Sequence, residues 1–417
     1  MTPSAGPPPS PRTARDGGPL GVGPGEAAVA AQALARVLPP ALGPLFDASF
    51  IRSSALYDEF VHRLVLRVFR EAGLEVAVRD AGTVEEIATR AGFEIGRARI
   101  PLRWILRHLT ARGVLADGAG DAGGRFGLRA AAPDLDPAVV RDEQARHDPS
   151  WLPAYVLAET VARDYPAFFR GEAAGEAILF SPARFHLWID YFSNDNGLYA
   201  VNNRVGAVAV EEWMPRDVGT ILELGGGLAS AAVAVIERLE AAGRLAGLRA
   251  YRFTEVVPAF LRRGRDALQR RFPDAPFLAF GAVDMNRPFG EQGVEAGTSS
   301  LVYAVNTLHV AYDLDFTLNE IFRALAPGGR LIVSECVRPR PEQAIYVEFV
   351  FNLMETFRSP RLDPRFRPNG GFLTPEQWTG AMEASGLVDV RLLPDVAGLR
   401  DRFPTFYIAA IGATRPR

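Results

Sequence analysis

The sequence has one cysteine and no lysine, and each scarcity excludes a kind of chemistry. A single thiol, Cys336, cannot build a disulfide framework or a cysteine metal cluster, and such low usage favours a reducing cytoplasm, where we expect the protein. All 46 basic residues are arginine, so Schiff-base catalysis, a P-loop lysine and a kinase-type lysine are excluded.

Histidine and long apolar segments are also scarce. The 5 histidines include no His-x-x-x-His pair, so we expect no zinc-hydrolase helix and no metal site. Residues 1–25 are rich in proline and glycine and lack the apolar core of a secretory signal, which predicts a disordered tail. The alanine-rich stretch 27–45 is interrupted by Arg36 and by Pro39–Pro40, so it cannot span a bilayer and no membrane partner is expected.

Charge and length set the broad class of the protein. The 417 residues carry 46 basic and 49 acidic side chains, and the net charge of −3 gives no general attraction to nucleic acid. A chain of this length favours two or three domains. After the tail we predict a helical domain over residues 26–145, a helical cap over 146–215 and an α/β domain over 216–417.

The first of these domains has the pattern of two helices followed by a hairpin. Thr83-Val-Glu-Glu86 is a capping box that begins a short helix, and a second helix is predicted from Ile95 to Arg112. Two short apolar runs then flank a Gly/Asp-rich turn. This order is the outline of a winged helix, so the domain is predicted to be winged-helix-like.

A winged helix raises the alternative of DNA binding. The second helix carries Arg97, Arg99, Arg103 and Arg107, which could face a phosphate backbone. The same helix is also rich in apolar residues, and the chain is acidic overall. A packing or dimerisation module is therefore the preferred interpretation, with a homodimer through this region as the expected assembly and no nucleic-acid partner.

From residue 218 onward, short apolar runs alternate with amphipathic helices, which is typical of a parallel sheet. Strands are predicted over residues 220–224, 249–255, 277–280, 300–305 and 330–335. Two further runs, 388–393 and 406–410, have no crossover helix between them, so we expect an antiparallel pair at one edge. The fold class is therefore α/β, with a seven-stranded sheet.

The first predicted strand leads into a glycine-rich loop, Glu223-Leu-Gly225-Gly226-Gly227. Glycines let a backbone turn tightly and approach a ligand without an intervening Cβ. A dinucleotide site would have a third glycine where Ser230 stands and an acid about 20 residues later, whereas Glu255 lies 28 residues beyond Gly227. The loop alone is therefore a weak signal.

The order of several motifs makes the signal specific. The glycine-rich loop at the end of one strand, with an acid ending the next, resembles class I S-adenosylmethionine-dependent methyltransferases, and the resemblance covers about residues 150–412. It implies the Rossmann-like seven-stranded sheet of that class. The further matching phrases begin or end at Phe253-Thr-Glu255, Gly281-Ala-Val-Asp284-Met285, Asn306-Thr-Leu-His309, Leu325 to Glu335, and Phe372 to Trp378.

The resemblance also implies a cofactor site for S-adenosyl-L-methionine. Gly225 and Gly227 would pass close to the methionine part, with Glu223 supporting their loop, and Asn306 is also assigned to the cofactor. Glu255 would accept hydrogen bonds from both ribose hydroxyls.

The adenine would meet the next segment of the chain. Asp284 would accept from the adenine amino group, with Met285 against the ring. Two positions depart from the family pattern, because Ala229 stands where many members have glycine and Val257 where serine is common. Neither departure removes a polar group that the cofactor requires.

Four further phrases are Phe169-Arg-Gly-Glu172, Leu179-Phe180-Ser-Pro, Tyr191-Phe through Asn202-Asn203, and Asn306-x-Leu-His309. They more closely resemble the methyltransferase domains of polyketide synthases, which use a His and a Glu as a catalytic dyad. Carried over to this sequence, the dyad is His309 and Glu335, each at the carboxyl end of a predicted strand. Imidazole titrates near neutrality, and a carboxylate can fix its tautomer. His309 would thus take a proton from an activated carbon before in-line methyl transfer.

Other functions stay open on the sequence. Free-standing O-methyltransferases with a winged-helix N-terminal region also use a histidine near this position, so a phenol or hydroxyl could be the acceptor. A pericyclic catalyst or scaffold could share the fold without transferring a methyl group. The acceptor expected here is a small molecule, polyketide-like or another secondary metabolite, either free or as an acyl group on a carrier.

Overall fold

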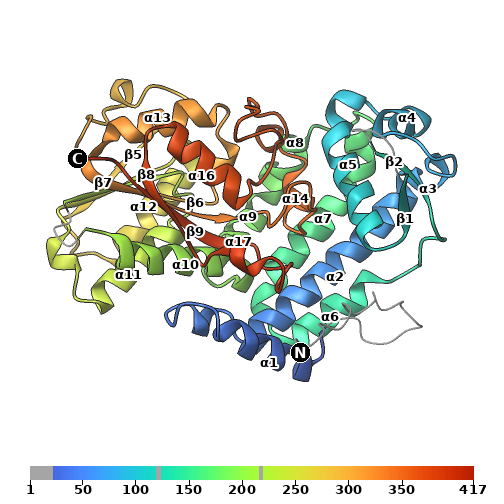
Figure 1. The fold of residues 1–417 in the computed structure, drawn as a ribbon, viewed down its shortest axis with the longest axis horizontal. Helices are drawn as coiled ribbons and strands as arrows, with labels where there is room; N and C mark the ends of the chain where they lie inside the picture. The colour runs from blue at the N-terminus through green and yellow to red at the C-terminus, as the bar shows by residue number, and fades with distance from the viewer. Residues whose placement is uncertain (1–21, 119–123, 216–218) are drawn as a thin grey trace, which may run out of the picture.

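A computed structural model describes residues 22–118, 124–215 and 219–417, in which a helical half lies beside a half built on a sheet (Figure 1). The helical half begins with α1 to α6 and a two-stranded hairpin. Their bounds are α1 Pro24–Ala35, α2 Ala48–Glu71, α3 Leu74–Ala77, α4 Val84–Arg90, α5 Ile95–Ala111, β1 Leu115–Gly118, β2 Arg125–Leu128 and α6 Pro137–His147.

The expected helix–helix–hairpin order is present in this half. Thr83 caps α4, where its side chain accepts from the Glu86 amide at 3.2 Å and the Glu86 side chain accepts from the Thr83 amide at 3.1 Å. Strands β1 and β2 pair antiparallel after α5. Residues 119–123, between the two strands, lie outside the described residues.

The boundary of the expected tail is wrong by two residues. Residues 1–21 lie outside the described residues, so the structure does not test that part of the prediction. Helix α1, however, begins at Pro24, inside the predicted 1–25 segment. The physical reason is that proline is well suited to the first turn of a helix, where its missing amide is not needed, so the proline-rich composition did not exclude a helix start.

Helices of the cap connect the two halves. Their bounds are α7 Leu152–Phe169, α8 Gly175–Leu179, α9 Phe185–Tyr191 and α10 Gly197–Trp213. Helix α10 lies directly on the sheet: a Cβ on Gly206 would come within 2.3 Å of the Tyr303 hydroxyl and 3.0 Å of Ser334 Cβ. The cap is therefore packed on the strands that carry the site.

The sheet has seven strands in the order β5-β4-β3-β6-β7-β9-β8. Their bounds are β3 Thr220–Leu224, β4 Ala250–Thr254, β5 Leu278–Gly281, β6 Ser299–Val305, β7 Leu325–Cys336, β8 Val388–Leu393 and β9 Ile408–Thr414. The strands from β5 to β7 pair parallel, and β9 pairs antiparallel with both β7 and β8. The expected α/β class and the antiparallel edge pair are confirmed.

Helices cover both faces of this sheet (Figure 1). The helices that follow β3 along the chain are α11 Ser230–Ala241, α12 Pro258–Arg271, α13 Leu314–Ala324, α14 Glu348–Phe351, α15 Glu355–Arg358, α16 Pro375–Ala384 and α17 Val396–Leu399, of which α14 packs against α7 and not on the sheet. The chain moves from β3 to β4 on one side and returns to β6 on the other, so the topological switch point lies at the carboxyl ends of β3 and β6, where open α/β sheets bind their ligands. In the part of the chain that is described, no helix has the length and apolar character needed to cross a membrane.

Candidate active site

The glycine-rich loop follows β3 and is shaped by two close approaches. Gly225 has φ +62°, and a Cβ there would come within 2.4 Å of the Thr307 side chain. A Cβ on Gly226 would come within 2.2 Å of the Phe253 ring. Gly227, at φ +56°, differs because a Cβ there would meet no atom within 4 Å. Glycine is therefore required at positions 225 and 226 by close packing within the protein, whereas position 227 borders open space.

Glu255 closes this loop from the end of β4. Its Oε2 accepts from the Gly227 amide at 2.9 Å and its Oε1 accepts from the Val257 amide at 2.8 Å. Burial raises the pKa of Glu255, while these backbone hydrogen bonds act in the opposite direction. Each carboxylate oxygen can accept a further hydrogen bond. The side chain is therefore held in place and still has acceptor capacity for a ligand.

Glu223 lies deeper than Glu255 and is 1% exposed. Its Oε2 accepts from the Tyr251 hydroxyl at 3.1 Å, and its Oε1 is buried without a hydrogen-bond partner among the described residues. Burial raises the pKa of Glu223 to about 8. The carboxylate thus contacts Tyr251 on the next strand, and its expected role in supporting the glycine-rich loop stays a prediction.

The segment after β5 forms a compact turn. The Asp284 amide donates to Gln292 Oε1 at 2.7 Å, and Asp284 Oδ1 accepts from the Asn286 amide at 2.9 Å. The Met285 carbonyl accepts from the Thr317 hydroxyl at 2.9 Å, and its side chain is half-buried. Asp284 and Met285 thus lie on a turn at the carboxyl edge of the sheet, half-buried and available to a ligand that reaches that edge.

His309 and Glu335 are in direct contact. Nδ1 of His309 and Oε2 of Glu335 are 2.7 Å apart, and both side chains are almost completely buried. Glu335 Oε1 accepts from the amides of Thr307 and Leu308, each at 3.1 Å. The pair forms because β6 and β7 are parallel neighbours, with Val305 opposite Ser334, so Glu335 at the end of β7 and His309 shortly after the end of β6 meet at one edge.

Aromatic rings and an arginine enclose the histidine. The His309 ring centroid is 4.4 Å from that of Phe372 and 5.8 Å from that of Phe357. The Arg367 guanidinium donates to the carbonyls of His309 and Ala311. Burial lowers the pKa of Arg367 to about 10. Phe372 begins one of the motifs found in the sequence, but that motif indicated no role for it at the site. Phe357 and Arg367 lie in none of the motifs, and all three are brought to His309 only by tertiary folding.

Asn306 has a contact that the sequence did not reveal. It has φ +47°, and its Oδ1 accepts from the Cys336 amide at 3.1 Å. The side chain therefore ties the end of β6 to the end of β7, next to the dyad. Its expected contact with a cofactor remains a prediction, because this hydrogen bond already gives it a structural role.

Contacts link most of the predicted site residues into one continuous edge. Glu255 holds Gly227, and the Thr307 hydroxyl donates to the Gly225 carbonyl at 3.3 Å. The Thr307 amide in turn donates to Glu335. The glycine-rich loop and the dyad are thus joined through one threonine, which lay inside a motif of the sequence but was not assigned a role.

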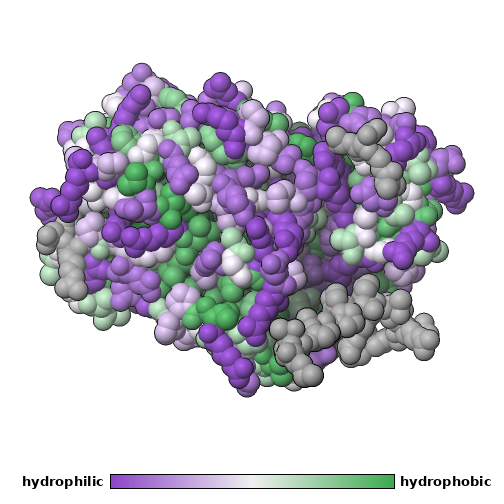
Figure 2. Space-filling view, viewed as in Figure 1, coloured by the Kyte–Doolittle hydropathy of each residue, from purple (hydrophilic) through white to green (hydrophobic). Residues whose placement is uncertain are grey.

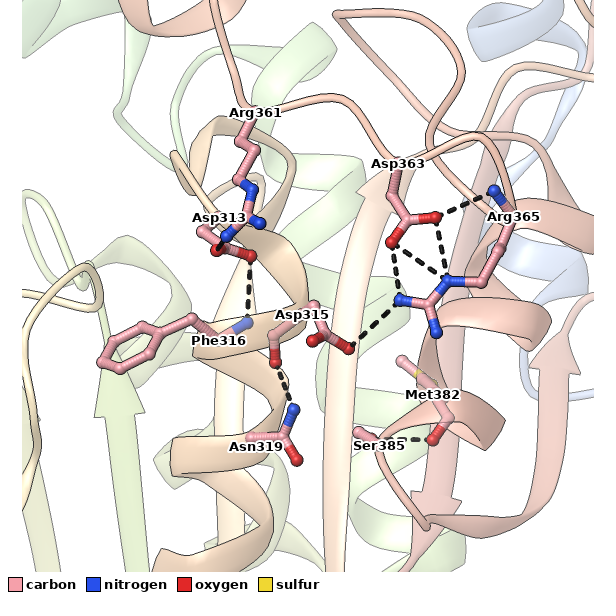
Figure 3. Close-up of polar contacts among 9 residues, drawn as sticks. All are labelled: Asp313, Asp315, Phe316, Asn319, Arg361, Asp363, Arg365, Met382 and Ser385. Carbon is pink, nitrogen blue, oxygen red and sulfur yellow. Dashed lines mark hydrogen bonds and ion pairs between the residues drawn. The ribbon is translucent and has the colours of Figure 1, made fainter.

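A second group of charges lies close to this edge but is internally paired. Figure 3 shows the contacts of Arg361 with Asp313 and of Arg365 with Asp363 and Asp315. These residues line a cavity of about 240 Å³. Because these arginines already face carboxylates, the cavity offers little free charge to a ligand. The candidate active site is therefore the edge that carries the glycine-rich loop and the dyad.

The seven-stranded sheet, covered by helices and joined to a helical half, is shared with solved methyltransferase structures. Solved structures with the same fold include the CurJ carbon methyltransferase, with a TM-score of 0.72, 21% identity and coverage of 94% of this chain and 99% of that one. The CMeT domain of the citrinin polyketide synthase has a TM-score of 0.68, 17% identity and coverage of 95% and 99%. The expected resemblance to polyketide-synthase carbon methyltransferases is thus confirmed for the fold.

Relatives among characterised proteins are similar over part of their length. Methyltransferase calH of Penicillium decumbens is 31% identical over 196 residues, which is 47% of this chain and 50% of that protein. Polyketide synthase PksR of Bacillus subtilis is 27% identical over 238 residues, 55% of this chain and 9% of that protein. The chain thus spans half or less of the curated relatives that it matches. No protein-family model matches the chain.

Proposed function

We propose that the protein transfers a methyl group from S-adenosyl-L-methionine to an activated carbon of a small, polyketide-like acyl substrate. The observation that carries the proposal is the buried hydrogen bond of 2.7 Å between His309 and Glu335 beside a glycine-rich loop. The similarity to proteins of known activity supports a carbon acceptor, since two of the structures with this fold are carbon methyltransferases.

The residues present fit the cofactor. Gly227 leaves open space where a Cβ would stand, Glu255 keeps acceptor capacity for two hydroxyls, and Asp284 lies half-buried on the neighbouring turn. The CalH methyltransferase, whose structure has this fold with a TM-score of 0.53 and 20% identity, is a complex with SAH. When bound, the cofactor supplies an electrophilic methyl group, and the protein does not need to activate it.

The chain's own task is to orient the acceptor and to remove its proton. Because Nδ1 of His309 lies against the Glu335 carboxylate, Nδ1 carries the proton in the neutral ring and Nε2 keeps its lone pair. Nε2 would accept the acidic proton of the acceptor, and Glu335 would stabilise the resulting imidazolium. The rings of Phe357 and Phe372 limit the access of water to this proton.

The first experiment measures cofactor binding without requiring the acceptor. Calorimetric titration with S-adenosyl-L-methionine should show saturable binding to the wild type that Glu255→Ala weakens. Glu240→Ala, an exposed glutamate at the end of α11, should leave the affinity unchanged. A folded wild-type protein that does not bind the cofactor would contradict the proposal and favour a pericyclic or scaffold role.

The second experiment tests the dyad. With a β-ketoacyl thioester as a model acceptor, His309→Gln and Glu335→Gln should abolish or strongly slow methyl transfer, by roughly 10²–10⁴-fold for a general base. Cofactor affinity should persist in both variants. Unchanged turnover in His309→Gln would refute the assignment of the base, and methylation of oxygen rather than carbon would favour the alternative of an O-methyltransferase.

A further inference from the structure

A larger cavity, of about 400 Å³, lies between helix α5 and the segment that follows β7. It is therefore formed jointly by the helical half and the sheet half. Figure 2 shows hydrophilic residues gathered along the junction of these two halves. The charged residues that line the cavity are Arg99, Arg103, Arg107, Arg338, Glu342, Glu348 and Arg358.

Positive charge dominates the lining of this cavity. The five arginines and two glutamates leave an excess of three positive charges (5 − 2), whereas the whole chain has a net charge of −3. One carboxylate, Glu342, serves both Arg103 at 3.0 Å and Arg107 at 2.9 Å. Arg338 pairs with Glu348, and Arg99 pairs with Glu85, which lies outside the lining, at 3.3 Å. Arg358 forms no ion pair with any described residue, although the charges of Glu176 and Glu355 act on it. The excess of positive charge therefore rests on Arg103, Arg107 and Arg358.

The same lining contains unused hydrogen-bond donors. Within the described residues, buried N–H groups without a partner include Nε of Arg107, Arg338 and Arg358 and Nδ2 of Asn352, and all four residues line the cavity. A buried donor without an acceptor costs free energy. Four such donors around one cavity indicate a ligand that supplies acceptors. Burial also lowers the pKa of Arg107 and of Arg358, a cost that a bound anion would offset.

The cavity shares a wall with the candidate active site. Phe357 lines it and also packs edge-on against His309, with ring centroids 5.8 Å apart. Arg338 lies three residues beyond Glu335 on the same chain segment. A ligand with its anionic end among the arginines could therefore direct its other end past Phe357 toward His309.

We propose that this cavity is an anion subsite that binds a phosphate ester on the part of the substrate remote from the methylated atom. The inference rests on the proposed function for the direction of the substrate, but not for the binding of the anion. A phosphate carries up to two charges and several acceptor oxygens, which match several guanidinium groups better than a single carboxylate does. The phosphate ester could belong to the arm of a carrier protein or to a free thioester.

The test uses two probes that differ only in the phosphate. Calorimetry should show that 4′-phosphopantetheine binds the wild type about tenfold or more tightly than pantetheine, the size expected for a charge-assisted contact. The ratio should approach one in Arg103→Gln/Arg107→Gln. Arg270→Gln, an exposed arginine at the end of α12 with the same change of charge, should keep the wild-type ratio.

Glu342→Gln is a second variant that tests the proposal even if Arg103→Gln/Arg107→Gln does not fold. Because Glu342 competes for both Arg103 and Arg107, its neutralisation should strengthen binding of 4′-phosphopantetheine. Equal binding of the two probes by the wild type, or a ratio unchanged in Arg103→Gln/Arg107→Gln, would overturn the proposal.

Two further comparisons separate the proposals and the sources of the phosphate. Binding of S-adenosyl-L-methionine, measured on the same samples, reports the proposed function independently of the anion subsite. Coenzyme A carries the same arm on a bulky nucleotide. Tight binding of coenzyme A would identify a free thioester as the source, and its exclusion alongside tight binding of 4′-phosphopantetheine would identify the arm of a carrier protein.

Discussion

Replacement of Glu223 by glutamine should change how the stability of the protein depends on pH. In the folded chain Glu223 is buried, its pKa is raised to about 8, and it accepts one hydrogen bond from Tyr251. Glutamine has nearly the same shape, can accept the same hydrogen bond through its amide oxygen and carries no charge. The substitution therefore removes the titration while it preserves the contact.

The sign and size of the effect follow from linkage. A carboxyl group whose folded pKa is raised from 4.5 to about 8 binds its proton more tightly in the folded state, so stability falls as pH rises through this window. At about 1.4 kcal/mol per pH unit, the wild type should lose roughly 3 to 4 kcal/mol from this group between pH 5 and pH 8. Glu223→Gln should not lose that amount.

Urea denaturation at pH 5 and pH 8 measures the difference. The comparison of wild type with Glu223→Gln cancels the titration of every other group that the substitution leaves alone. Glu240→Gln, an exposed control, should behave as the wild type. If the free energies of unfolding of wild type and Glu223→Gln change with pH in parallel, to within about 1 kcal/mol, burial does not raise the Glu223 pKa as the reasoning requires.

Three further predictions concern the loop and the helical half. Gly226→Ala should unfold or strongly destabilise the protein, since its Cβ would come within 2.2 Å of a phenylalanine ring. Gly227→Ala should fold, because its Cβ would meet no atom within 4 Å, but it should lose about 1 kcal/mol of stability to backbone strain and bind S-adenosyl-L-methionine weakly. Ala229 has φ +70°, so Ala229→Gly should raise the free energy of unfolding, measured by urea denaturation, by up to about 1 kcal/mol. A lower free energy of unfolding in Ala229→Gly would show that the site tolerates the methyl group of alanine. Burial lowers the pKa of His62 to about 3 and also lowers the pKa of its neighbour His108. The melting temperature of the wild type should therefore fall as pH drops below about 6.5, and that of His62→Gln/His108→Gln should fall less. A parallel fall in the wild type and the double variant would refute this prediction.

The sequence correctly predicted helix α5 but left its role open. The bounds of α5 agree with the expected Ile95 to Arg112 to within one residue. Its periodicity could not tell which partner would face the arginines. In the structure Arg99, Arg103 and Arg107 line the cavity shared with the sheet half. Dimerisation through this region stays a prediction, since no second chain is present.

The order of the strands along the chain and the glycine-rich loop could be predicted from the sequence pattern, and the resemblance to polyketide-synthase methyltransferases pointed to His309 and Glu335 as a pair. Alternation of apolar runs and helices predicts a parallel sheet, and a parallel sheet brings the carboxyl ends of its strands to one edge. His309 and Glu335, 26 residues apart in the chain, could therefore be expected side by side.

The side chains that surround His309 and Glu335 are brought there by tertiary packing, which the sequence pattern does not show. Phe357, Phe372 and Arg367 reach His309 from a segment without regular periodicity, and the donors of Arg107 and Asn352 meet only because α5 packs against the chain after β7. Local sequence patterns record the repeat of a helix or strand, but not the partner across a long loop. The pocket, and with it the choice of substrate, depends on such long-range packing.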